Sequence, residues 1–405
     1  VGYILIDGDK ISAVEQVSQT KPISSTKSDI ILSHALAGQY LGYKFIFLED
    51  VWNYKHIQEG TMKFINNNNF YNILFFLGLF VAIYIINYFV GTVVFERIVT
   101  MLFIYIILTV GLQIFMGNSG ILSFAHIGFM CIGAYSSGLL SIPVKMKGFV
   151  LRDLYPVLQN VSLDPIISIL IGGIFTAFVA AILTLPLMRL KDAAAVITSF
   201  ALLMVIHSIV VGWSAVTNGP RTFFGIPKAT TLEIAIIFAF FAVTFAFIYK
   251  DSRFGLLLRA TRDNDIAAES IGANIIYLRW FAIIASAFLA GIAGGLWGHF
   301  ITSFSPKSFY LKETFLVISM LVIGGSFTVT GAIAGALLVY ISFEILRWIE
   351  KVIKFSDYIT IEFIGLTEVI LAITMIIFLI TKPKGLFAFH EIGDTIRKIL
   401  VKKKD

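Results

Sequence analysis

Long apolar runs separate the polar parts of this chain, and they limit its possible folds more than any other feature does. A helix needs about 20 apolar residues to cross the hydrocarbon core of a bilayer. Backbone groups find no water there, so a crossing segment must bond its own N–H and C=O groups, as a helix does. We therefore predict an all-α polytopic membrane protein with about eight to ten transmembrane helices. Eight runs are predicted spans: Tyr71–Val94, Ile98–Met116, Phe124–Ile142, Ile166–Leu187, Ala193–Gly212, Leu232–Tyr249, Trp280–Ile301 and Ile361–Thr381.

Composition supports this prediction and excludes several other classes of protein. Hydrophobic residues make up 58% of the chain and charged residues only 14%, a balance that a water-soluble globular domain of this size does not keep. The net charge of +6 comes from basic residues in the loops between apolar runs, where they report topology rather than nucleic-acid binding. The single Cys131 and six scattered histidines exclude disulfide frameworks and zinc sites, so we expect no metal and no cofactor.

A further apolar stretch, Phe315–Trp348, is interrupted by glycines at Gly324, Gly325 and Gly331. The stretch is too short for two full spans and too interrupted for one. It predicts a broken or re-entrant pair of helices, a structure that membrane proteins place where backbone lines a cavity.

Basic loops predict the orientation. The loop 250–279 contains five basic residues and the tail after Thr381 contains several more, so both are predicted to be cytoplasmic, together with the N-terminal extension. Counting spans backwards then places Lys145, Lys147 and Arg152 outside, against the rule. A partly re-entrant segment at Gly117–Ile142 would remove this conflict, so both topologies stay open before Ile166.

Three regions follow from these patterns: a soluble, α/β-like extension or fused fragment at residues 1–63, a membrane domain at 64–390 and a basic tail at 391–405. The extension reads as strand, helix and strand, with strands at Tyr3–Asp7 and Lys44–Leu48. The first residue is a valine and no signal-peptide pattern follows it. We expect no signal peptide, and we expect the natural start to lie upstream.

The segment Gly117–Tyr135 carries polar and small residues inside an apolar run. Gly117, Asn118, Ser119 and Gly120 free backbone groups that hydrocarbon does not satisfy, so this stretch should be buried in protein or line a wet cavity. His126 follows them. It is a candidate for the lining of a pathway, and a polar contact between packed helices is the alternative.

Overlapping glycine pairs predict close helix approach. Gly291 with Gly295, Gly294 with Gly298, and Gly331 with Gly335 each have G-x-x-x-G spacing. A pathway between two closely packed helices uses the same small residues, so packing and transport are both consistent with this pattern.

The segment Arg259–Asn274 predicts a short amphipathic helix in the cytoplasm. At 100° per residue, alanines and isoleucines fall opposite the charged face, with Ile266 as the exception. The charges are balanced in sign, whereas a helix that lies on anionic lipid is dominated by lysine and arginine. A small, balanced surface suits docking into a protein groove. The charged face consists of Arg259, Arg262, Asp263, Asp265 and Glu269.

These motifs together resemble one family. RATRDNDIAAESIG, GNSGILSFAHIGFMCIGAY, FLAGIAGGLWGHF, the Ser305-Pro306 pair, GGS at 324–326 and PKG at 383–385 occur in the order seen in the LivM-type permease subunit of branched-chain amino-acid ABC importers. The resemblance covers roughly residues 98–390. It implies a transport subunit of the plasma membrane that has no ATP site and forms half of a translocation path in the lipid bilayer.

The resemblance also implies partners and site residues. The partners are separate ATP-binding subunits, a second homologous permease subunit and an extracytoplasmic substrate-binding protein, and no nucleic acid. Arg259–Asn274 would be the coupling helix that contacts the ATPase, with Ala267, Ala268, Glu269 and Gly272 matching the core of the motif. The segments Gly117–Tyr135 and Ile323–Gly335 would face the path. Branched-chain amino acids are the implied substrates, with other amino acids, urea and short amides left open.

Residues 1–50 resemble a fragment of the archaeal geranylgeranylglyceryl phosphate synthase. The resemblance ends at Glu49, where Asp50-Val51-Trp52-Asn53 replaces the family's Gly-Ser-Gly phosphate turn, so no catalytic role is carried over. It suggests an alternative function, an intramembrane prenyltransferase or a bifunctional lipid-synthesis fusion. That chemistry needs clustered carboxylates for magnesium diphosphate, and Asn264-Asp265 is followed by Ala267 and Ala268 instead. A channel would need rings of charge that the spans lack.

Overall fold

The computed structural model describes residues 54–151, 153–270, 272–353, 366–382, 385–387 and 391–392, and four short strands near the N-terminus. Strand β1 (Gly2–Ile4) pairs in parallel with β4 (Ile46–Leu48), and β2 (Ile6–Asp7) pairs with β3 (Ile23–Ser24). The helix expected between the predicted strands lies outside the described residues. The reading of residues 1–63 as a separate unit stays a prediction, and its boundary falls inside the first described helix, α3 (Tyr54–Val90).

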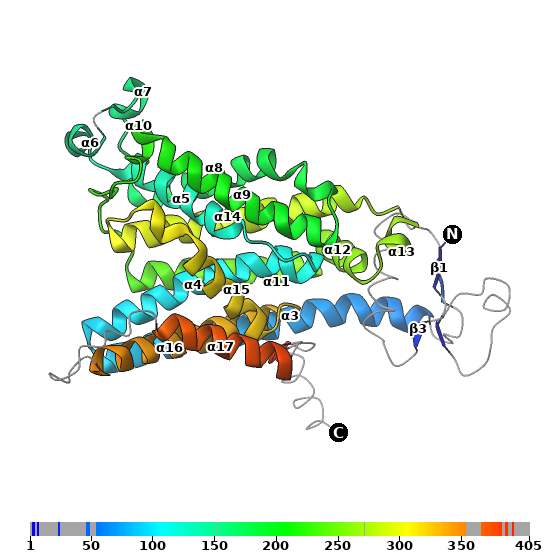
Figure 1. Cartoon of the computed structure of the whole chain (residues 1–405). Helices are drawn as coiled ribbons and strands as arrows, with labels where there is room; N and C mark the ends of the chain where they lie inside the picture. Colours follow the sequence, from blue (N-terminus) through cyan, green and yellow to red (C-terminus); the bar gives the residue numbers. More distant parts are fainter. Residues whose placement is uncertain are drawn as a thin grey trace.

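The described part of the chain from α3 onwards is helical, as Figure 1 shows. Its longer helices are α4 (Val93–Ser119), α5 (His126–Ser141), α8 (Pro165–Thr184), α9 (Asp192–Gly212), α11 (Leu232–Asp251), α14 (Ile275–Ile301), α15 (Leu311–Gly324), α16 (Val329–Ile353) and α17 (Leu366–Thr381). Shorter helices are α6 (Val144–Val150), α7 (Pro156–Gln159), α10 (Ser214–Thr217), α12 (Arg253–Asp263) and α13 (Asp265–Ser270), with 3-10 turns at Leu187–Arg189 and Pro306–Phe309.

Seven of the described helices are long and apolar enough to cross a membrane: α3, α4, α8, α9, α11, α14 and α16. The predicted run Phe124–Ile142 forms the shorter helix α5, and the described part of the run Ile361–Thr381 forms α17, each of 16 residues. The predicted start of the second run, at Ile361, lies outside the described residues. The first run was predicted to continue to Val94, but α3 ends at Val90 because Gly91 adopts a φ of +60° and turns the chain. The structure is therefore an all-helical membrane protein, with seven long candidate spans in its described residues.

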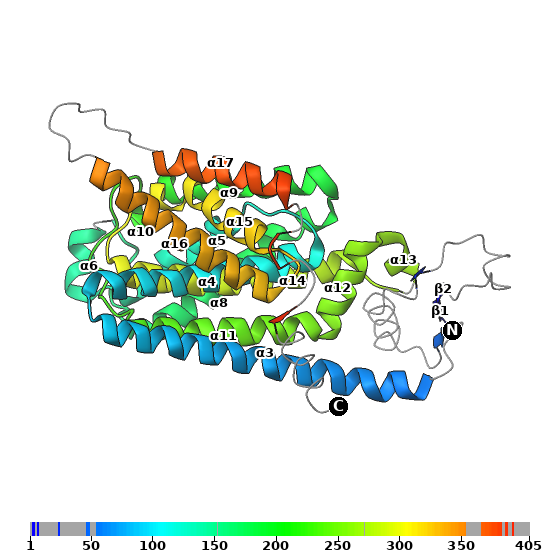
Figure 2. The same ribbon diagram turned by 90° about the horizontal axis from the view of Figure 1, so that it is seen from below.

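Helices α4 and α14 form the centre of the bundle, with α5, α8 and α11 packed around them. Helix α3 runs along α11 on one side (Figure 2). Gly291 and Gly294 on α14 allow close approaches, because a Cβ at Gly294 would lie 1.9 Å from Met130 O and a Cβ at Gly291 would lie 2.6 Å from Thr176 Oγ1. The predicted close packing at these two glycines is confirmed.

The broken segment forms a pair of helices at the predicted position, one short and one long. Helix α15 has 14 residues and ends at Gly324, and the next residue, Gly325, adopts a φ of +116°. Helix α16 has 25 residues and is long enough to span a membrane, so the stretch holds one full-length helix and one short one, as a stretch too short for two full spans predicts. Helix α16 extends past Trp348 to Ile353 through the charged residues Glu350 and Lys351, so the end of the helix does not coincide with the end of the apolar stretch.

The basic segment at residues 144–150 lies at the opposite end of the bundle from α12 and α13 (Figure 1). The chain between Gly120 and Ile142 therefore runs once from one end of the bundle to the other, first as the loop 121–125 and then as α5. Lys147 is only 2% exposed and donates to Leu158 O at 2.8 Å and to Val161 O. Because the ammonium of Lys147 bonds backbone carbonyls inside the protein, this lysine should not be counted among the basic residues that predict the orientation.

Candidate functional site

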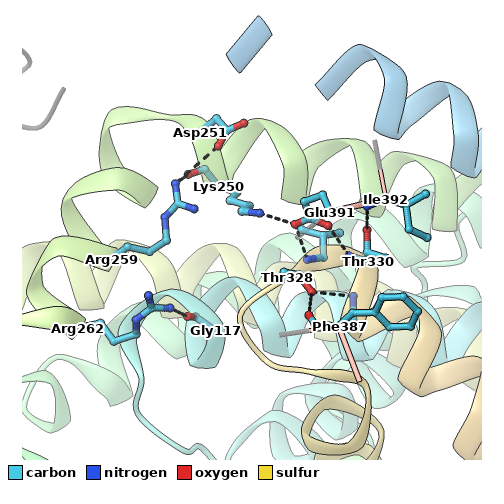
Figure 3. Close-up of polar contacts among 12 residues, drawn as sticks. Gly117, Lys250, Asp251, Arg259, Arg262, Thr328, Thr330, Phe387, Glu391 and Ile392 are labelled. Carbon is cyan, nitrogen blue, oxygen red and sulfur yellow. Dashed lines mark hydrogen bonds and ion pairs between the residues drawn. The ribbon is translucent and has the colours of Figure 1, made fainter. Parts of the chain in front are cut away.

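Three segments that are far apart in the sequence meet at one end of the bundle (Figure 3). Arg262 of α12 lies between the other two: its Nη1 donates to Gly117 O at 2.8 Å, and its guanidinium carbon lies 4.7 Å from the centroid of the Phe327 ring. A Cβ at Gly117 would lie 2.1 Å from Ser326 O, and a Cβ at Gly120 would lie 2.7 Å from Arg262 Cγ. The glycines thus make room for direct contact between the end of α4, the α15–α16 break and α12.

The predicted single helix at Arg259–Asn274 is wrong, because two helices occupy this segment. Helix α12 ends at Asp263, Asn264 is extended with φ −158° and ψ 107°, and α13 begins at Asp265. Asn264 Oδ1 accepts a hydrogen bond from Ala267 N at 3.0 Å, the usual capping arrangement at a helix start. The Asp-Asn-Asp sequence before Ile266 was a capping signal, and the helical periodicity concealed it.

Most charged residues of this segment form hydrogen bonds or ion pairs with other residues of the same chain. Arg259 Nη2 donates to Lys250 O at 2.9 Å and lies 3.7 Å from Asp251 Oδ1. Asp265 pairs with Lys191 at 3.2 Å and with Arg279 at 3.3 Å. The α12–α13 pair is therefore fixed to the ends of α11, α9 and α14.

Burial changes which residues of α13 are free to meet a partner. Ala268, expected on the docking surface, is 1% exposed and packs inside the chain, because the break at Asn264 rotates α13 relative to α12. Ala267 is half-buried, and Asp263, Glu269 and Gly272 are exposed. Ile266, the exception in the predicted amphipathic pattern, is 77% exposed. Gly272 adopts a φ of +86°, which favours glycine there.

The α15–α16 break is covered by the segment that follows α17. Leu386 N donates to Ile323 O at 3.0 Å and Phe387 N donates to Gly324 O at 2.9 Å. Thr328 Oγ1 donates to Phe387 O at 2.5 Å. Gly385, with a φ of +80°, leaves no room for a Cβ, which would lie 2.4 Å from Gly325 Cα. The sequence showed this segment as a family motif but gave no sign of its contact with the break.

Glu391 is a functional candidate that sequence reasoning missed, because the predicted domain boundary falls directly before it. Its carboxylate accepts from Val329 N at 3.0 Å and Thr330 N at 2.9 Å, at the start of α16, and forms an ion pair with Lys250. Burial alone raises the pKa of this carboxyl, but the Lys250 ammonium and the Thr330 donors outweigh that effect and hold the pKa below its usual value. Glu391 is therefore a buried carboxylate at neutral pH.

The remaining predicted path residues have local polar partners. His126 is 2% exposed; its Nδ1 lies 3.1 Å from Ser123 Oγ and its Nε2 lies 2.5 Å from Ser286 Oγ on α14. Ser286 in turn donates to Gly111 O at 2.5 Å. Asn118 and Ser119 bond carbonyls one turn back in α4, Ile114 O and Phe115 O. His126 thus makes the contact between packed helices that was the alternative to a pathway role.

Close backbone contacts at the α15–α16 break explain why glycines occupy these positions. A Cβ at Gly324 would lie 2.0 Å from Gly331 O, and a Cβ at Gly331 would lie 2.4 Å from Gly325 O. Gly335 is equally close to Met320 O, at 1.9 Å. The start of α16 therefore crosses the end of α15 at backbone contact distance.

Comparison with known proteins identifies a family for most of the chain. The family described as branched-chain amino acid transport system / permease component matches residues 94–379. The high-affinity branched-chain amino acid transport system permease protein LivM of Salmonella typhimurium is 26% identical over 323 residues, which cover 71% of this chain and 69% of the relative. The nucleoside ABC transporter permease protein NupC of Lactococcus lactis is 22% identical over 232 residues, covering 52% of this chain and 69% of the relative.

The N-terminal segment has relatives of another kind. Geranylgeranylglyceryl phosphate synthase of Chitinophaga pinensis is 46% identical over 48 residues, which cover 12% of this chain and 19% of the enzyme. No solved structure matches the chain. The permease match spans well over half of the residues and includes α12, α13 and the α15–α16 break. The chain therefore belongs to the family of permease components of branched-chain amino acid transport systems and is a transport subunit rather than an enzyme.

Proposed function

We propose that this chain is one permease subunit of an ABC importer for branched-chain or related neutral amino acids. It forms half of the translocation path and docks a separate ATPase subunit through α12 and α13. One observation carries the proposal: Arg262 of α12 binds both Gly117 O and the ring of Phe327. An ATPase that moves α12 thereby acts on the two segments predicted to line the path.

The docking surface is the exposed side of α13. The side chain of Ile266 is exposed to solvent, and the nearby residues Asp263, Glu269 and Gly272 are exposed as well. A large apolar side chain in the aqueous phase, ringed by polar groups, suits an apolar pocket in a partner. Ile266 is the proposed anchor in the ATPase groove, and Ala267, Ala268 and the ion pairs of Arg259 and Asp265 support it from behind.

The orientation of the chain follows from this assignment. The end that carries α12, α13 and Glu391 is cytoplasmic, and the end that carries α6, α7 and α10 faces outward, toward a substrate-binding protein. The shorter helices α5, α15 and α17 lie in the bilayer beside the seven long spans, so the described residues contribute ten helices to it. We place the chain in the plasma membrane, with the N-terminal extension and the C-terminal tail inside.

The path lies between this chain and a second homologous permease subunit. The segments that contain Gly117, Gly120, Gly324, Gly325 and Gly331 border its inner part, and these glycines let the segments pack closely beside it. His126 and its serine partners hold α5 against α14 beside it. The relatives' names include a branched-chain amino acid permease and a nucleoside permease. Because these names give two classes of substrate, the substrate of this chain has to be measured.

The test is assembly and coupling in one preparation. The chain is co-expressed with the second permease, the ATPase subunits and the binding protein, and the complex is purified through a tag on the ATPase. The proposal predicts that this chain is retained and that leucine-loaded binding protein stimulates ATP hydrolysis. A complex that forms without this chain, or ATP hydrolysis that leucine-loaded binding protein leaves unchanged, would contradict it.

A further inference from the structure

The cluster around Glu391 is not explained by the proposed docking or by the path. A carboxylate that is only 5% exposed is costly to bury unless it is paired and hydrogen-bonded. Glu391 has both kinds of partner, the Lys250 ammonium and the two backbone N–H groups at the start of α16. Such an arrangement is specific, because charge-assisted bonds are stronger and more directional than neutral ones.

The segment after α17 binds both sides of the break in the α15–α16 hairpin. A helix leaves its last carbonyls and its first N–H groups without partners inside the helix. Leu386 N and Phe387 N donate to the last carbonyls of α15, at Ile323 and Gly324. Glu391 accepts from the first N–H groups of α16, where the helix dipole favours an anion. Residues 385–387 and Glu391 thus supply hydrogen-bond partners to both helix ends where the chain breaks.

The Glu391 carboxylate is also connected, through Lys250, to α12 of the proposed docking element. Lys250, the ion-pair partner of Glu391, is near the end of α11, and its carbonyl accepts from Arg259 of α12. Figure 3 shows Arg259, Lys250 and Glu391 in one row that ends at the start of α16. A continuous set of charge-assisted contacts therefore joins α12 to the break, in parallel with the Arg262 contact on the other side.

We propose that Glu391 is a positioning residue that transmits movement of α12 to the α15–α16 break. It holds the start of α16 through its two backbone hydrogen bonds and holds α11 and α12 through Lys250. Movement of α12 by the ATPase then shifts the break instead of being absorbed by the loop 325–328. This inference rests on the proposed function, and it predicts that loss of the carboxylate uncouples ATP hydrolysis from transport without releasing the ATPase.

The experiment measures leucine transported per ATP hydrolysed in vesicles that contain the complete importer. Glu391→Gln keeps the shape of the side chain and removes its charge. Thr328→Val weakens the same segment at its bond to Phe387 O and serves if Glu391→Gln assembles poorly. The matched control is Thr374→Val, which removes the hydroxyl of an exposed threonine bonded only within α17.

The expected result for Glu391→Gln is normal ATPase retention, with leucine transported per ATP reduced at least about five-fold. Thr328→Val should reduce the same ratio to a smaller extent, and Thr374→Val should equal the parent. A purely structural role would lower the amount of complex and both rates together, and would leave the ratio unchanged. A ratio for Glu391→Gln equal to the parent's overturns the inference.

A charge exchange separates the two contacts of Glu391. Lys250→Glu combined with Glu391→Lys keeps an ion pair but places a cation against the N-terminus of α16, where the helix dipole opposes it. The double variant should stay uncoupled. Full recovery of the ratio would overturn the role assigned to the α16 contact. If the parent importer itself carries no leucine, the proposed function fails and the inference fails with it, whereas an active parent with a coupled Glu391→Gln variant rejects the inference alone.

Discussion

The absence of a Cβ atom at three glycines allows α4, α12 and the α15–α16 break to meet. Gly117, Gly324 and Gly331 each lie where an added Cβ would be at most 2.4 Å from a backbone oxygen. Arg262 fills the remaining space with a hydrogen bond to Gly117 O and a contact on Phe327. The residues that matter at this scale are those with no side chain and those with a long, charged one.

Gly331→Leu should abolish uptake while the variant still inserts and keeps its ATPase. The new Cβ would lie 2.4 Å from Gly325 O, so α15 and α16 must separate at the break, whereas the exposed surface of α13 is unchanged. Labelled leucine uptake and ATPase pull-down are the two measurements. Gly78→Leu is the control, because nothing lies within 4 Å of a Cβ at Gly78 on α3. Uptake by Gly331→Leu at the parental rate would show that the break is peripheral to transport.

Arg262→Met should lower the uptake rate by about tenfold, since a hydrogen bond from a charged donor is worth roughly 1.5–3 kcal/mol. The methionine keeps much of the apolar contact with Phe327 but loses the bond to Gly117 O. The same change at Arg253, which is exposed on α12, is the control and should leave uptake within twofold of the parent. Equal rates for the two variants would mean that Arg262 does not link α12 to the path.

At the scale of residues, the sequence identified positions by residue type and missed those whose role depends on contacts with distant segments. Glycines inside apolar runs stand out by themselves, and seven of the eight predicted path residues lie at the end of α4 or at the α15–α16 break. Glu391 gives no such signal, because its burial depends on Lys250 and on the start of α16, which are 141 and 61 residues away. Ala268 was named from the family motif alone, which does not distinguish an exposed alanine from a buried one, and the structure buries it.

At the scale of elements, the apolar runs predicted helix positions well because burial in lipid requires helices whatever their neighbours are. Predicted and observed ends agree closely for α9 and α11. Helix α14 begins five residues earlier than its apolar run, because Asn274 caps it by accepting from Tyr277 N. Where polar residues form part of a helix, hydropathy alone does not find its start.

The α12–α13 pair should lose its partner on a single change at its most exposed apolar residue. Ile266→Asp places a charge in the proposed apolar pocket, and burial of an unpaired charge costs several kcal/mol, so the variant should insert but lose its ATPase subunits. Val157→Asp is the control: Val157 is 83% exposed on α7, at the other end of the bundle. Pull-down through the ATPase measures both. ATPase retention by Ile266→Asp at the level of Val157→Asp would assign α13 to the membrane surface instead.

At the scale of the whole molecule, two regions have separate relatives. The permease family matches residues 94–379, and the lipid-synthase likeness covers only 48 residues. Fold class was predictable from composition and apolar runs, whereas the meeting of three motifs at one end was not. That meeting depends on how α4, α12 and α15 pack, and the sequence of each segment alone does not contain it.

Deletion of residues 1–63 should leave transport intact, because the permease family match begins only at residue 94 and the candidate span of α3 begins at Asn69. Uptake per inserted protein, compared with the full chain, is the measurement. The intact chain should also transfer no prenyl group to glycerol phosphate. Loss of uptake with normal insertion, or measurable prenyl transfer, would assign this region a function.

The central claim is that this chain carries neutral amino acids when an ATPase moves α12. Vesicles that contain the complete importer, with binding protein outside the permease and ATP at the ATPase, should accumulate labelled leucine. Unlabelled isoleucine and valine should compete, and urea and uridine should not. Accumulation that needs no ATP, or competition by urea or uridine but not by isoleucine, would contradict the account.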